Sequence, residues 1–120
     1  MKNVLVVESD QGLSWLICES LRDAGYEPVP CAPEAAVALA AERPASAIIA
    51  ALSSAAVEQA PLYKALRREP RTKDIPIIII TGRGDATIRR RLGEKPPTVL
   101  FKPLVLAALM EAVAQAVGGA

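Results

Sequence analysis

The sequence contains no histidine. Histidine titrates nearest to neutral pH and is the most frequent metal ligand, so its absence argues against most hydrolase and zinc chemistries. Aromatic residues are also scarce, with one Trp, two Tyr and one Phe in the chain. Because proteins that bind single-stranded nucleic acid stack bases on aromatic side chains, we do not expect a nucleic-acid partner.

The two cysteines, Cys18 and Cys31, are too few for a disulfide framework and are not spaced as a metal-binding pair. We expect them to be reduced thiols. The longest apolar stretch, residues 75–80, is far too short to cross a bilayer, and no signal-peptide pattern precedes the first apolar run. A net charge of +1 gives no field that would attract nucleic acid or an anionic membrane. The expected location is cytoplasmic, without a membrane partner.

Hydrophobic residues make up 52% of the 120 residues, which suffices for the core of a single domain spanning residues 1–120. Four short runs rich in Val, Ile and Leu, at residues 3–7, 46–50, 77–81 and 98–102, are typical of strands buried on both faces. Stretches with helical periodicity alternate with these runs. The alternation predicts βαβ units, and hence an α/β fold with a parallel sheet and right-handed crossovers.

Capping residues and helical spacing predict the helices. Asp10 is a good N-cap, and Leu13, Ile17 and Leu21 share one face of the helix that it begins, which should end near Gly25. The remaining elements that we expect are a weak strand at 27–29, an alanine-rich helix at 33–42, and helices at 56–68, 86–92 and 104–117.

A group of mostly polar residues follows or ends the four apolar runs. Because the carboxyl ends of parallel strands meet at one edge of a sheet, where ligands of open α/β sheets bind, we expect these residues to converge. They are Glu8, Ser9, Asp10, Ala50, Thr81 and Lys102, the last followed by Pro103.

The chain has, in order, an acid cluster (Glu8, Ser9 and Asp10), a small residue (Ala50), a hydroxyl (Thr81) and a Lys-Pro pair (Lys102 and Pro103). This order, at these spacings, resembles the receiver domain of two-component response regulators. The likeness covers nearly the whole chain. It implies a three-layer CheY-like, flavodoxin-like fold, with a five-stranded parallel sheet of order 2-1-3-4-5 and helices on both faces. In a receiver, the acid cluster and an acceptor aspartate hold magnesium, and the aspartate takes a phosphoryl group. By this resemblance position 50 is the acceptor, and Thr81 and Lys102 match the hydroxyl and the lysine that bind phosphoryl oxygens.

The sequence departs from the receiver pattern at the positions that carry this chemistry. Ala50 has no nucleophilic atom and no metal ligand, and Ser9 has a neutral hydroxyl where a carboxylate is expected. Residues 53–57 lack the usual Pro and Asp-Gly pair, and Val99 stands in place of an aromatic that reports phosphorylation. We therefore expect no cofactor, no bound magnesium and no phosphorylation at position 50.

Lys102 also has an interpretation that does not depend on the resemblance. A lysine at a buried strand end must find a counter-charge or lose its proton. Glu8 is the natural partner and Asp10 the second, so we interpret Lys102 as half of a structural ion pair. An alternative is an anion bound by Lys102, Thr81 and nearby backbone amides. Without the resemblance, Thr81 is interpreted simply as a β-branched residue at the end of a strand.

One region, around the helix expected at 86–92, has a clear excess of positive charge. It is either a solvated helix face or a surface that binds a protein partner or a second copy of the chain. In receivers the fourth helix, fifth strand and last helix form the usual interaction face, which favours the protein partner. The candidate interaction face of this chain consists of these basic residues and Val99 of the expected fifth strand. The basic residues are Arg83, Arg89, Arg90, Arg91 and Lys95.

The sequence thus predicts a stand-alone receiver-like module of bacterial two-component signalling, which acts by protein–protein contact and is not an enzyme. Two alternatives remain open. The first is phosphorylation at a substitute residue, namely Asp10, Glu8 or Ser53. The second is sensing of a small anion or metabolite in the pocket around Ala50. An enzyme of independent chemistry ranks last, because no nucleophile–base pair is visible.

Overall fold

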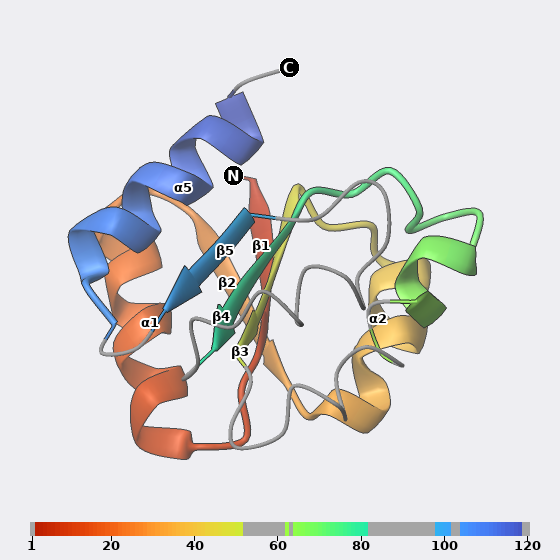
Figure 1. Cartoon of the computed structure of the whole chain (residues 1–120), viewed down its shortest axis with the longest axis horizontal. Coiled ribbons are helices and arrows are strands. Elements are labelled where there is room, and N and C mark those ends of the chain that lie inside the picture. Colours follow the sequence, from red (N-terminus) through yellow and green to blue (C-terminus); the bar gives the residue numbers. More distant parts are fainter. Residues whose placement is uncertain (1, 52–61, 63, 82–97, 102–103, 119–120) are drawn as a thin grey trace.

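The computed structural model describes residues 2–51, 62, 64–81, 98–101 and 104–118. Its centre is a five-stranded parallel sheet of order β2-β1-β3-β4-β5 (Figure 1), which confirms the predicted fold class and strand order. The strands are β1 (Asn3–Val7), β2 (Glu27–Cys31), β3 (Ala47–Ala51), β4 (Ile77–Thr81) and β5 (Thr98–Phe101). The helices are α1 (Gln11–Asp23), α2 (Ala36–Glu42) and α5 (Leu106–Gly118), and residues 64–68 are also helical.

Helices cover both faces of the sheet, with α1 and α5 on one side and α2 on the other (Figure 1). Alternate residues of β1 point to opposite faces. Val4 and Val6 lie in the core cluster formed with α1 and α5, whereas Leu5 and Val7 lie in the cluster formed with α2. All four are at most 2% exposed. A strand buried on both faces needs apolar residues at every position, which explains the continuous apolar runs.

The start of α1 is fixed by a side-chain cap, as predicted. The Asp10 carboxylate oxygen Oδ1 accepts a hydrogen bond from the backbone N–H of Leu13 at 3.0 Å. Ile17 and Leu21 are fully buried, which confirms the predicted inner face. The helix ends just before Gly25, whose φ of 91° lies in the left-handed region that favours glycine.

The strand predicted at 27–29 is longer than expected, because β2 continues through Pro30 to Cys31. Proline lacks a backbone N–H, so in sheets it is confined to positions where that donor is not needed. The N–H of Glu27 donates to the carbonyl of Lys2 at 3.0 Å, beside β1. Since backbone donors alternate in direction along a strand, the backbone nitrogens of Pro28 and Pro30 face the open edge of the sheet. There they also hinder pairing with a further strand.

Other boundaries differ from the predictions by small amounts. β3 is Ala47–Ala51 and not 46–50, and α5 begins at Leu106 and not at residue 104. The alanine-rich helix opens with a 3₁₀ turn at Pro33–Ala35, and such turns are frequent at helix ends. The helix predicted at 86–92 and most of the one at 56–68 lie outside the described residues. Within the described part of the chain, no helix is long and apolar enough to cross a bilayer.

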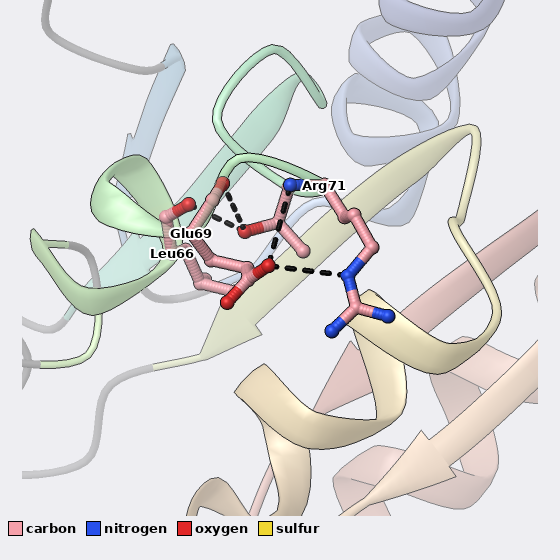
Figure 2. A network of polar contacts seen from close by, with 4 residues as sticks. Leu66, Glu69 and Arg71 are labelled. Atoms are coloured by element: carbon pink, nitrogen blue, oxygen red, sulfur yellow. Dashed lines mark hydrogen bonds and ion pairs between the residues drawn. The ribbon is translucent and has the colours of Figure 1, made fainter.

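The loop before β4 is held by hydrogen bonds near the end of the helical segment 64–68 (Figure 2). Thr72 is fully buried, and its hydroxyl donates to the backbone carbonyl of Leu66. Oε1 of Glu69 accepts from Nε of Arg71 at 3.2 Å across the same turn. The bond from Thr72 satisfies a buried hydroxyl in the loop that leads to β4 at Ile77.

Candidate functional site

The register of the strands brings the ends of β1, β3, β4 and β5 to one edge of the sheet. Val7, the last residue of β1, pairs with Ala50, and Ala50 pairs with Ile79 of β4. Thr81, the last residue of β4, pairs with Phe101, the last of β5. The loop after β1 therefore lies at the same edge as position 50 and the end of β4. This is the edge at which open α/β sheets bind their ligands.

Glu8 is the buried acid at this edge among the described residues, with 7% of its surface exposed. Its Oε1 accepts a hydrogen bond from the N–H of Asp10 at 2.7 Å, whereas its Oε2 is buried and has no hydrogen-bond partner among the described residues. Asp10 is exposed, and its Oδ1 is already used as the cap of α1. Burying a carboxylate oxygen is costly unless a donor or a cation satisfies it, so Oε2 marks a place for such a partner.

Position 50 offers only a methyl group at this edge. Ala50 is 5% exposed, and Ser9 in the loop after β1 is exposed. Thr81 is placed at the end of β4 by its backbone. Lys102 lies outside the described residues, so its predicted ion pair with Glu8 stays a prediction.

The predicted interaction face lies mostly outside the described residues. Val99 of β5 is its described member, and it is half-buried against the core cluster on the α2 side of the sheet. The members outside the described residues are Arg83, Arg89, Arg90, Arg91 and Lys95, and the substitute acceptor Ser53 is outside them as well.

A groove of about 570 Å³ opens beside the acid cluster, between α1 and the segment 30–34. Both Glu8 and Trp15 line it, and Trp15 is 64% exposed. We did not predict this groove from the sequence. A signal was present, because Trp15 lies two residues after Leu13 and therefore off the apolar face that Leu13 shares with Ile17. A large aromatic placed there is left at the surface.

Cys18 and Cys31 line the same groove, and both are free thiols. Cys18 packs into the core cluster on the α1 side, whereas Cys31 packs against the cluster on the α2 side. Burial raises the pKa of the Cys31 thiol. Burial also raises the pKa of Cys18, against smaller opposing effects of a hydrogen bond with Ser14 and the charge of Arg22. A raised pKa keeps both thiols protonated at neutral pH, so neither is an activated nucleophile.

The chain matches no protein-family model and no curated protein sequence. Solved structures match it along nearly its whole length. A protein described as a response regulator from Chloroflexus aurantiacus is 25% identical, with a TM-score of 0.83 over 98% of each chain. The chemotaxis protein CheY4 of Vibrio cholerae is 22% identical, with a TM-score of 0.85 over 97% of this chain and 98% of that one.

A third match is the receiver domain of the sensor histidine kinase PA1611 from Pseudomonas aeruginosa, whose structure has a magnesium ion coordinated in the active-site cleft. It is 22% identical, with a TM-score of 0.83 over 98% of each chain. The structural neighbours of this chain are thus receiver domains of response regulators and sensor kinases, and the chain has their CheY-like fold.

Proposed function

We propose that this chain is a degenerate receiver of bacterial two-component signalling, which acts by protein–protein contact and is not phosphorylated at position 50. One observation carries the proposal. Ala50 is buried at the carboxyl end of β3 and pairs with Val7, one residue before the acid cluster. Phosphoryl transfer to a receiver needs a carboxylate nucleophile at this place, and a methyl group has no atom that could attack phosphorus.

The described side chains do not fit a magnesium ion, which the receiver fold implies. Magnesium demands near-octahedral oxygen ligands and is bound in proteins through carboxylates. Asp10 and Glu8 each have one carboxylate oxygen engaged with a backbone N–H, and Ala50 contributes no oxygen. Among the described residues, no group of three or more His, Cys, Asp or Glu side chains is placed to hold a metal. The proposal therefore includes no magnesium and no other cofactor.

Phosphorylation at a substitute residue is the alternative, and the hydrogen bonds around the acid cluster count against it. A phosphoryl group on Asp10 would compete with the cap of α1, and one on Glu8 would have to enter a buried position. Ser53 lies outside the described residues and stays open as an acceptor.

The partner that we propose is a protein of the same signalling pathway, or a second copy of the chain. The face is the basic region around residues 86–92 together with β5 and α5, as the resemblance to receivers implies. In this proposal the chain is cytoplasmic, is not an enzyme, and has no nucleic-acid or membrane partner.

A small-molecule sensor is the second candidate function, and the groove lined by Glu8 and Trp15 favours it. Both candidates share the absence of an acceptor at position 50, and one molecule could combine them.

The test of the proposed function is incubation with acetyl phosphate and magnesium, followed by intact-mass measurement. A receiver that retains its acceptor aspartate, treated in parallel, serves as the positive control. We expect an unchanged mass. A stoichiometric gain of one phosphoryl group would refute the proposal, and peptide mapping to Asp10, Glu8 or Ser53 would identify the substitute acceptor.

A further inference from the structure

We propose that the groove between α1 and the segment 30–34 binds a small organic cation, with a primary ammonium or guanidinium group on a short apolar body. The proposal rests on the proposed function, since a magnesium ion held by the acid cluster would occupy the same carboxylate. It goes further by assigning a ligand class to a site that a receiver without its acceptor leaves unused.

The carboxylate of Glu8 is the first observation. Its side chain lines the groove, more than nine-tenths of the residue is buried, and Oε2 has no hydrogen-bond partner among the described residues. Such an oxygen is satisfied best by a charged N–H donor, because charge-assisted hydrogen bonds are about twice as strong as neutral ones. In this proposal, a cationic head group bound in the groove satisfies the carboxylate of Glu8 with a charge-assisted hydrogen bond.

Trp15 is the second observation. It lines the groove from α1, and its exposed ring leaves a face open to a ligand. An indole face attracts cations through its quadrupole and also covers apolar carbon. A groove of about 570 Å³ falls within the range of small-molecule sites, and Pro30 and Pro33 add apolar surface to its opposite wall.

The charges around the groove select a cation over an anion. Glu8 and Glu34 line it, and the arginine that lines it, Arg22, forms an ion pair with Glu19. The groove therefore has an excess of negative charge on its described walls. A free carboxylate or phosphate would meet repulsion from Glu8, and the cation on the described walls, Arg22, is already paired with Glu19.

Titration with matched probes tests the inference. The cationic probes are n-pentylammonium and agmatine, and the controls of similar size are pentanol and pentanoate, all at one ionic strength. Trp15 is the one tryptophan of the chain, so its fluorescence reports occupancy of the groove directly, and calorimetry gives the affinity independently. We expect a saturable signal with both cations and none with the alcohol or the carboxylate.

Variants assign the site. Glu8→Gln keeps the shape of the side chain, and it should weaken binding at least about tenfold by removing one charge-assisted hydrogen bond. Trp15→Ala, at an exposed position, should weaken binding several-fold by calorimetry. Glu42→Gln is the matched control, because Glu42 is exposed on α2 and does not line the groove.

Several results would overturn the inference. One is a signal from pentanol or pentanoate that equals the signal from the cations. Another is an affinity for the cations that neither Glu8→Gln nor Trp15→Ala changes, or that only one of them changes. A third is a loss of affinity in Glu42→Gln as large as the loss in Glu8→Gln. Saturable magnesium binding that displaces the organic cations would also overturn it. Phosphorylation by acetyl phosphate in a protein that still binds pentylammonium through Glu8 would refute the proposed function and leave the cation site standing.

Discussion

Glu8 and Asp10 are joined by a hydrogen bond of 2.7 Å, in which the backbone N–H of Asp10 donates to Oε1 of Glu8. Asp10 in turn accepts the N–H of Leu13 through its own carboxylate. The two acids that would begin a metal site in a receiver thus organise the turn that starts α1. They have a structural role that requires no metal.

Asp10 should contribute to stability as a helix cap. We expect Asp10→Ala to lower the free energy of unfolding by about 1 kcal/mol, because the N–H of Leu13 loses its acceptor. Asp10→Asn should cost much less, since asparagine caps helices as well as aspartate does. Urea unfolding of the three proteins measures both effects. An Asn variant as unstable as the Ala variant would show that the charge of Asp10, and not its cap, matters.

Lys102 should pair with Glu8 inside the site. If it does, Glu8→Ala leaves the ammonium without a counter-charge and Lys102→Met leaves the buried carboxylate of Glu8 without one, so each variant should cost about 3 kcal/mol. Denaturant midpoints measure both variants. An unchanged midpoint in Glu8→Ala would mean that no structural pair exists. Because Lys102 and an entering ammonium would compete for one carboxylate, Lys102→Met should also tighten the binding of pentylammonium.

Restoring a carboxylate at position 50 should make stability depend on magnesium. Ala50→Asp puts a second carboxylate at a buried strand end near Glu8, so without metal we expect a loss of about 2 kcal/mol. Millimolar magnesium should recover part of this loss, because a ligand that binds the folded state stabilises it.

The control for this experiment is Ala50→Asn, which has a similar shape and no charge. It should be insensitive to magnesium in thermal unfolding, as should the wild type. Phosphorylation of Ala50→Asp should stay low, since Ser9 remains neutral. Tight, saturable magnesium binding to the wild type would contradict the absence of a metal site that we propose.

The sequence predicted the fold well because its strongest signals are local and repeated. Residues 4–7 and 77–80 within the apolar runs have no polar position, which occurs where a strand is covered on both faces, and the structure buries all eight of them. Asp10 and Gly25 marked the ends of α1 through capping chemistry that depends on a few neighbouring residues. The extension of β2 to Cys31 was missed, because prolines argue against a strand unless its edge position is known.

The site was harder to predict than the fold. Spacing alone placed Glu8, Ala50 and Thr81 at strand ends, and the register of the sheet then brings those ends together. The groove beside them depends on how α1 packs against the end of β2, which is a relation between distant segments that no local pattern contains. The hydrogen bond from Asp10 to Glu8 is likewise a product of the turn geometry.

The thiols of Cys18 and Cys31 should react slowly and make stability fall at high pH. Burial raises the pKa of both thiols in the folded state. Their contribution to stability is therefore complete below the pKa of the unfolded thiol, about 8.5, and is lost as the pH rises from there through the folded pKa. Urea unfolding between pH 7 and pH 10 should show this decline, and iodoacetamide should label the folded protein slowly at pH 7.

A variant with both cysteines replaced by alanine is the control, because lysines and tyrosines also titrate in this range. Its stability should decline less with pH than that of the wild type. An identical decline in the two proteins would mean that the thiols do not contribute.

The basic region around residues 86–92 should be where the protein meets its partner or a second copy of itself. Arg89, Arg90 and Arg91 follow one another on a short predicted helix and concentrate positive charge there, which favours contact with acidic groups of a partner. Glu111, exposed on α5, could supply such a group from a second copy. Since exposed ion pairs are screened by salt, association measured by light scattering or pull-down should weaken as ionic strength rises.

Replacing the three arginines with glutamate should abolish the complex and leave the circular dichroism spectrum unchanged. The matched control changes the same number of exposed cations elsewhere, at Lys64, Arg68 and Lys73, and should bind as the wild type does. If the arginine variant recovers the same partners as the wild type, the binding face lies elsewhere on the molecule.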